Sequence, residues 1–158
     1  MRIYCFLQIL IILLFAACTR DGAPPPATQP DASAPITTIK IEVTGLHSQD
    51  GKVVLALFSS ADGFPDDRDK ALRWLEMEID DDRVTFLIED VSAGRCAVSV
   101  FHDENANDKM ETDFFGRPEE GYGFSRNAKG RFGPPSFEDA AIDVSELPHV
   151  IRIDINYN

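Results

Sequence analysis

Apolar and polar residues alternate along much of this chain, and that period of two limits the fold more than any other feature. Ile39, Ile41 and Val43 are each separated by a polar residue, and residues 151–157 repeat the pattern near the C-terminus. Successive side chains of a strand point to opposite faces, so the pattern predicts strands with one buried and one solvated face. A domain built from strands is therefore expected.

Five further segments complete the predicted set of strands. Residues 52–58 (KVVLALF) are apolar at nearly every position, which is typical of a strand covered on both faces. Residues 72–79 and 83–88 flank three consecutive aspartates and are predicted to pair as a hairpin. With residues 95–101 and 142–144, about seven short strands result. They predict an all-β, antiparallel two-sheet β-sandwich, immunoglobulin-like or transthyretin-like, with a long irregular loop before the last two strands.

The N-terminus carries an apolar run, residues 3–17, preceded by Arg2. The run is shorter than the roughly 20 apolar residues of a membrane-spanning helix and ends in small residues. We therefore expect a signal peptide over residues 1–17.

The end of this run, residues 15–18 (FAAC), resembles the lipobox of bacterial lipoproteins. The resemblance implies that the Cys18 thiol is acylated and becomes the mature N-terminus, which would hold the protein on a membrane. Thr19 follows where an Asp would resemble an inner-membrane retention signal, so an outer-membrane position facing the periplasm is expected. The alternative is a plain secretory signal, cut near Ala17, with Cys18 left as a free thiol of a soluble, secreted protein.

The rest of the chain divides into a tether and one domain. Residues 18–35 are rich in Pro and Ala with almost nothing large to bury, and they are predicted to be an extended tether. Residues 36–158 can bury a single core.

Cys96 has no expected partner and shares a strand face with Val98 and Val100, which predicts a buried, inert thiol. The net charge of −12 disfavours non-specific binding of nucleic acid or anionic membranes.

Oxygen-bearing side chains recur at alternate positions after His102, as in loops that wrap a hard cation such as Ca²⁺. The candidate ligands are Asp103, Asn105, Asn107, the Lys109 carbonyl, Glu111 and Asp113. Asp108 stands where such loops have Gly, and Phe114 stands where they have a bidentate Glu, for which Asp113 is the substitute. The alternative needs no metal: the Asp and Asn side chains form successive Asx-turns that organise the loop.

Residues 114–137 combine many glycines and prolines with six aromatic residues. The glycines and prolines argue against a regular helix or central strand, and the aromatics argue against disorder, so a closed cap over one end of the sandwich is expected. One interpretation is that the aromatics fill a second small core. The other is a ligand or partner surface, with stacking and anion-binding residues Tyr122, Phe124, Phe132, Arg117, Arg126 and Arg131.

The stretch from residue 102 to residue 140 resembles the signature of the bacterial DUF2141 family. That family reads roughly His-Asp-x-Asn-x-Asn-Gly, then Phe-Gly-x-Pro-x-Glu-Gly-Tyr-Gly-Phe-Ser, then Phe-Gly-x-Pro-x-Phe-x-Asp-Ala, and the resemblance covers about residues 39–157. Cys96 stands where the family tends to have Tyr, and Asp108 where it tends to have Gly. The resemblance implies a sandwich fold and a secreted setting, and it implies no established activity.

Catalytic motifs are missing from the sequence. There is no Gly-x-Ser-x-Gly, no His-Glu-x-x-His and no phosphate loop, and the histidines His47, His102 and His149 are scattered. We expect His102 to be a hydrogen-bonded structural residue and Glu119-Glu120 to be a solvated turn. The favoured hypothesis is a lipid-anchored binding or scaffold module of the cell envelope, which contacts a protein or glycan. The alternative is a periplasmic hydrolase of a small polar substrate that uses the acidic loop.

Overall fold

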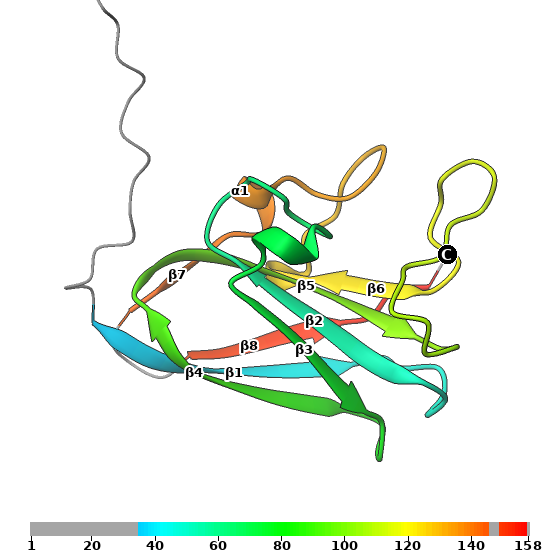
Figure 1. The fold of residues 1–158 in the computed structure, drawn as a ribbon, viewed down its shortest axis with the longest axis horizontal. Helices are drawn as coiled ribbons and strands as arrows, with labels where there is room; N and C mark the ends of the chain where they lie inside the picture. Colours follow the sequence, from blue (N-terminus) through cyan, green and yellow to red (C-terminus); the bar gives the residue numbers. More distant parts are fainter. Residues whose placement is uncertain (1–34, 146–148, 158) are drawn as a thin grey trace, which may run out of the picture.

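The structure, a computed structural model, describes residues 35–145 and 149–157 (Figure 1). The predicted signal peptide, Cys18 and all of the tether except Pro35 lie outside the described residues. Eight strands form two sheets, so the predicted β-sandwich is confirmed. No helix in the described part of the chain is long and apolar enough to cross a membrane.

The smaller sheet has three strands in the order β4-β1-β8. Strand β1 (Ile36–Thr44) pairs antiparallel with β4 (Val84–Ser92) and parallel with β8 (His149–Asp154). The expectation of a fully antiparallel sandwich is therefore wrong for one pair. Alternation of apolar residues fixes which face of a strand is buried but carries no information on its direction.

The larger sheet has the order β3-β2-β5-β6, and a fifth strand pairs with the beginning of β5. Its strands are β2 (Lys52–Phe58), β3 (Arg73–Glu78), β5 (Gly94–Asp103), β6 (Gly121–Phe124) and β7 (Ile142–Val144).

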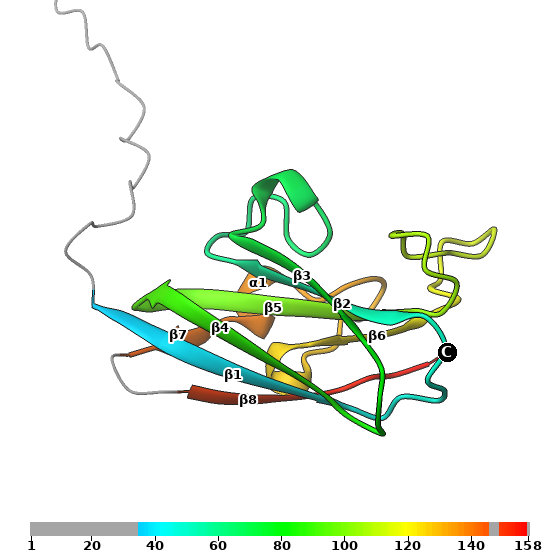
Figure 2. The same cartoon turned by 60° about the horizontal axis from the view of Figure 1, so that its bottom comes forward.

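The predicted hairpin between residues 72–79 and 83–88 does not form. Strand β3 pairs with β2 in the larger sheet, whereas β4 pairs with β1 in the smaller one, and the turn at residues 80–82 joins the two sheets (Figure 2). Two adjacent apolar strands serve equally well as a hairpin or as a bridge between sheets, because each one needs only a buried face.

The main core lies between the two sheets. Ile39, Ile41 and Val43 of β1 are fully buried there, as the alternation predicts. Cys96 lies on the inner face of β5 with Val98 and Val100, and burial raises the pKa of its thiol to about 12. The prediction of a buried Cys96 is confirmed, and its thiolate is strongly disfavoured.

A second, smaller core covers the outer face of the larger sheet. Phe58 of β2 and Ala97 of β5 pack there against the short helix α1 (Phe137–Ala140) and against Phe124. Burial of residues 53–58 on both sides matches the prediction for this apolar strand. Two 3₁₀ turns, η1 (Arg68–Lys70) and η2 (Ser125–Asn127), complete the described helices.

The segment predicted to hold no regular helix or central strand contains the short strand β6, which lies at the edge of the larger sheet, so that expectation is not contradicted. A Cβ atom on Gly121 would lie 2.4 Å from the Tyr157 ring, and one on Gly123 would lie 2.6 Å from Ile153 Cγ2. The glycines therefore let β6 approach the end of β8 closely. Tyr122 N–H donates to the Asn156 carbonyl at 3.0 Å, and Asn156 N–H donates to the Tyr122 carbonyl at 2.8 Å, so backbone bonds join the two sheets here.

Candidate functional site

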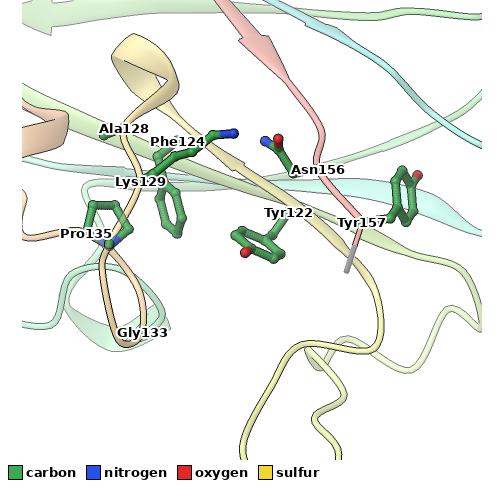
Figure 3. A pocket seen from close by; sticks show the side chains of 9 residues that line it. Tyr122, Phe124, Ala128, Lys129, Gly133, Pro135, Asn156 and Tyr157 are labelled. Carbon is green, nitrogen blue, oxygen red and sulfur yellow. The ribbon is translucent and has the colours of Figure 1, made fainter.

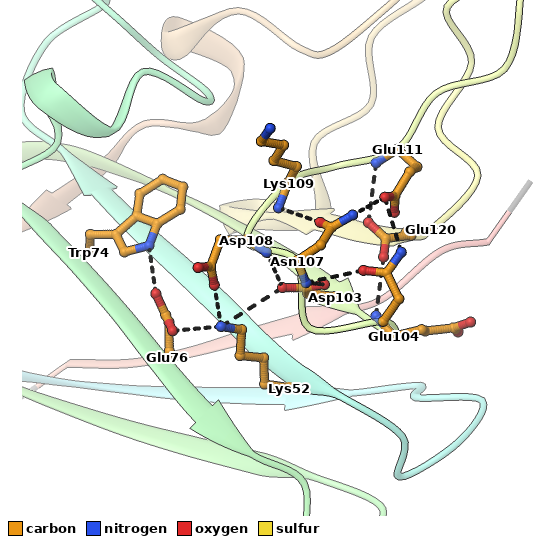
Figure 4. Close-up of polar contacts among 11 residues, drawn as sticks. Lys52, Trp74, Glu76, Asp103, Glu104, Asn107, Asp108, Lys109, Glu111 and Glu120 are labelled. Carbon is orange, nitrogen blue, oxygen red and sulfur yellow. Dashed lines mark hydrogen bonds and ion pairs between the residues drawn. The ribbon is translucent and has the colours of Figure 1, made fainter.

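The acidic loop, residues 103–113, leaves the end of β5 and is folded back on its first residue. Asp103 is fully buried, and its carboxylate accepts hydrogen bonds from Asn107 N–H at 3.0 Å and Asp108 N–H at 2.8 Å (Figure 4). Ala106 and Asp108 adopt the left-handed conformation, with φ of 57° and 66°. Asp108 therefore takes the backbone conformation for which calcium loops use Gly.

Side-chain amides continue the same pattern along the loop. The Asn105 side-chain oxygen accepts from Asn107 N–H at 3.1 Å, and that of Asn107 accepts from Lys109 N–H at 2.9 Å. These contacts are the successive Asx-turns of the metal-free alternative.

Lys52, the first residue of β2, supplies a positive charge that sequence reasoning missed. Its ammonium group lies 2.7 Å from the Glu76 carboxylate and 3.9 Å from that of Asp103, and it also donates to Asp108 (Figure 4). The hydrogen bonds to Asp108 and Glu76 raise the pKa of Lys52, and the bond to Lys52 lowers the pKa of Asp108. The pairing of β2 with β5 places Lys52 opposite Asp103. This contact could be predicted only if the register of the two strands were known.

A pair of carboxyl groups closes the base of the acidic loop. Glu120, only 5% exposed, accepts from Glu104 N–H at 3.1 Å and from Glu111 N–H at 3.3 Å. Burial, together with its neighbour Glu111, raises the pKa of Glu120 to about 7, whereas hydrogen bonds from Asn105 and Asn107 lower the pKa of Glu111. At pH values below about 7 the proton of this pair therefore resides on Glu120, and Glu111 is the ionised partner.

This arrangement corrects the expectation that both Glu119 and Glu120 lie in a solvated turn. Glu119 is exposed, but Glu120 is buried. Sequence reasoning had no signal to separate the two, because Glu120 is buried by contact with a loop distant from it in sequence.

The structure brings together the side chains of four of the six predicted calcium-ligand residues and pairs a fifth, Asp113, elsewhere. Asp103, Asn105, Asn107 and Glu111 are joined by the hydrogen bonds given above. The backbone of Lys109, whose carbonyl is the predicted ligand, is joined to Asn107 through its N–H, whereas Asp113 pairs with Arg117 at 2.6 Å. Within residues 35–145 and 149–157, no three His, Cys, Asp or Glu side chains are grouped so that they could hold a metal ion. Calcium binding by the acidic loop stays a prediction.

A cavity of about 250 Å³ lies beside β6 and contains two of the predicted partner residues. Tyr122 lies between the loop that carries Gly133 and Pro135 and the C-terminal Tyr157 (Figure 3). The remaining lining residues are Phe124, Ala128, Lys129, Gly130 and Asn156. The cavity thus combines aromatic rings with one cationic side chain and one amide.

The other predicted partner residues lie elsewhere. Arg126 donates to the Ala141 carbonyl at 3.4 Å, Arg117 is held by Asp113, and Arg131 lies over the ring of the exposed Phe132, 5.9 Å from its centroid. The six residues therefore do not form one surface.

The predicted closed aromatic cap exists only in part. Phe124 and Phe137 are buried in the second core, whereas Phe114, Phe115 and Phe132 are exposed. The cap prediction is wrong for these three residues, because their short Gly-containing tips extend beyond the core that would bury them.

His102 is a buried structural residue whose tautomer follows from its contacts. Its Nε2 atom lies 2.7 Å from the Asp50 carbonyl, an acceptor, so Nε2 carries the proton. Nδ1 then accepts from the Tyr157 hydroxyl at 2.6 Å, and that hydroxyl accepts from His47 N–H at 3.1 Å. Both ring nitrogens are occupied, which leaves His102 no free atom for a substrate.

Comparison with known proteins gives one match. Residues 41–152 match the model of a family described as "Uncharacterized protein conserved in bacteria (DUF2141)". No curated protein and no solved structure in the comparison matches the chain.

Proposed function

Because the chain belongs to the DUF2141 family, a bacterial family, we propose that it is a binding module of the bacterial cell envelope, anchored by lipid at Cys18. The module takes its ligand, a glycan or a segment of an envelope protein, in the cavity beside Tyr122. Calcium, where it binds, orders the neighbouring acidic loop.

The observation that carries this proposal is the cavity lined by Tyr122, Lys129 and Asn156. Tyr122 is half-buried, and its ring lies 5.9 Å from that of the buried Phe124, which fixes it at the cavity. Lys129 is exposed and can donate to a hydroxyl or carboxylate of the ligand. A fixed ring beside a few polar groups is the common composition of a small-ligand site.

The test is ligand capture by variants that alter the cavity without emptying the core. Phe124 is unsuitable because it is 7% exposed and belongs to the second core, so its truncation would destabilise the fold. We expect Tyr122→Ser combined with Lys129→Ala to abolish binding to a panel of envelope oligosaccharides and peptides, measured by calorimetry. Leu87→Ala is the matched control, since Leu87 is exposed on β4 of the other sheet. Unchanged binding by the double variant would refute the cavity as the site.

The lipid anchor is supported by the FAAC sequence at residues 15–18 alone. Acylation adds about 0.8 kcal/mol of membrane affinity per buried methylene, so two or three chains would hold the protein stably. Mass spectrometry of the mature N-terminus tests it, and an unmodified Cys18 would refute it.

A second candidate function, hydrolysis of a small polar substrate, is favoured by one observation. Glu120, with its pKa of about 7, next to the ionised Glu111 resembles the acid and base of a carboxylate pair. A panel of esterase and glycosidase substrates tests this function, with Glu120→Gln as the inactive variant.

A further inference from the structure

Three phenylalanines at two loop tips are exposed to an unusual degree. Phe114 is 97% exposed, Phe115 is 79% exposed and Phe132 is 98% exposed, more than any other large apolar side chain in the described residues. Isolated apolar residues on a surface are ordinary, but adjacent or tip-located aromatic rings of this exposure mark an interaction site. Neither the cavity nor either core uses these rings.

The two tips are built from the same three residue types, Phe, Gly and Arg. Residues 114–117 read FFGR and residues 130–133 read GRFG. In each tip the arginine lies over a phenylalanine: Arg117 is 5.7 Å from the centroid of the Phe115 ring, and Arg131 is 5.9 Å from that of Phe132. A ring with a guanidinium beside it suits the boundary of a bilayer, because the ring can enter the acyl region while the long arginine side chain reaches back to the phosphates.

The second tip is locally basic although the chain is acidic. Residues 126–135 contain Arg126, Lys129 and Arg131 and no acidic residue, within a chain of net charge −12. Charges more than about 8 Å away are largely screened at physiological ionic strength. The three local cations therefore dominate the electrostatic potential that acts on a lipid surface at this tip. The overall acidity, which disfavours general adhesion to membranes, does not prevent contact through this one face.

The tips can reach one surface together. The four residues of β6 separate the loops that carry them, about 13 Å of strand, and both loops rise from the same side of the sandwich in Figure 1. The 18-residue segment 18–35 would span up to about 55 Å in extended form. An anchor at Cys18 therefore keeps the domain within reach of a bilayer and lets it turn this face toward the lipid.

We propose that Phe114, Phe115 and Phe132 insert into the interface of a phospholipid bilayer, with Arg131 at the level of the phosphates and Arg117 held by Asp113 above the Phe115 ring. Insertion orients the tethered domain and brings the cavity beside Tyr122 close to the membrane surface. The proposal concerns the loop tips and does not depend on any ligand in the cavity.

The test places tryptophan at the tips of the full-length chain. Phe115→Trp and Phe132→Trp variants are incorporated into vesicles of phosphatidylethanolamine and phosphatidylglycerol, with and without bromine on the acyl chains. We expect both new tryptophans to be quenched by the brominated lipid and to emit at shorter wavelength than in detergent-free buffer. Trp74 is present in every variant and also fluoresces. Its signal is measured with the wild-type chain and subtracted from that of each variant.

The control is Leu87→Trp, which places the same reporter on an exposed apolar position of the other sheet. It should be quenched by aqueous acrylamide and not by brominated lipid. The proposal is overturned if the tip tryptophans behave like this control. Since Phe115 and Phe132 are exposed, the variants should keep the wild-type melting temperature, so a negative result cannot be attributed to unfolding. The vesicles contain no glycan or second protein, so this result is independent of the proposed cavity ligand.

Discussion

At the scale of single residues, the shared proton of Glu111 and Glu120 makes the acidic loop sensitive to pH. The folded-state pKa of Glu120 is raised from the model-peptide value of 4.5 to about 7. The folded protein thus binds more protons than the unfolded chain between these pH values. The stability contributed by protonated Glu120 is fully present below about pH 4.5 and is lost as the pH rises through 7.

Replacing Glu120 by Gln should remove this dependence. The amide keeps an acceptor for Glu104 N–H and offers a donor to the Glu111 carboxylate, as the protonated acid does. After allowance for solvent screening, we expect Glu120→Gln to be about 1 kcal/mol more stable than the wild type at pH 8 and equal to it near pH 5. Urea unfolding at the two pH values measures this difference. Glu119→Gln removes the same charge from an exposed neighbour and should change little, so an equal effect of both variants would contradict the assignment.

At the scale of elements, β6 is held in place by the absence of side chains at Gly121 and Gly123. Gly123→Ala would force its Cβ into Ile153 Cγ2 and to within 3.0 Å of the Asp154 carbonyl oxygen. Overpacking of this kind costs about 1–3 kcal/mol. We expect a lower melting temperature and faster amide exchange at Tyr122 and Asn156, whose backbone bonds join the sheets. Wild-type exchange at these two amides would show that β6 does not depend on close approach.

The acidic loop carries its own prediction. If the loop binds Ca²⁺, the ion should raise the melting temperature with sub-millimolar to millimolar affinity, as is usual for extracellular sites. Glu111→Gln should weaken the effect, because it removes the charge of one candidate ligand, whereas Glu119→Gln should not. Calorimetry that finds neither heat nor a shift in melting temperature would leave the Asx-turns and Lys52 as the sole organisers of the loop.

The positions of strands could be predicted from the sequence where the need for a buried face alone determines them. The alternating segments at β1 and β8 and the apolar segment at β2 were predicted because each needs a buried face. The partners of β3 and β4 were not, because strand pairing depends on contacts distant in sequence. Strand β6 was missed since Gly usually weakens a strand, and only the proximity of β8 reveals why Gly is needed there.

At the scale of the whole molecule, processing of the N-terminus predicts the number of free thiols. If Cys5 leaves with the signal peptide and Cys18 is acylated, as proposed, the denatured mature protein should contain one reactive thiol, that of Cys96. In the native state this thiol should be unreactive, because it is buried and its pKa is raised to about 12. Titration with an aromatic disulfide reagent counts the thiols. Two thiols in the denatured protein would instead indicate a plain secretory signal.

The candidate site was predictable only in its parts. The hydrogen-bonding role of Asp103, Asn105 and Asn107 followed from their spacing, and Tyr122 and Phe124 were identified by their aromatic character. The roles of Lys52 and Glu120 could not be predicted, because each depends on a strand register or loop contact formed only in the folded chain.

The parallel pairing of β1 with β8 has a mechanical consequence. Strand β1 follows the predicted tether, and six residue pairs, from Ile39–His149 to Thr44–Asp154, join β1 to β8. Because the strands run in the same direction, tension between the beginning of β1 and the end of β8 would load these pairs in shear, all at once. An antiparallel neighbour pulled in the same way would open one pair after another. With the proposed anchor at Cys18, the pairing of β1 with β8 would resist force applied through the N-terminus.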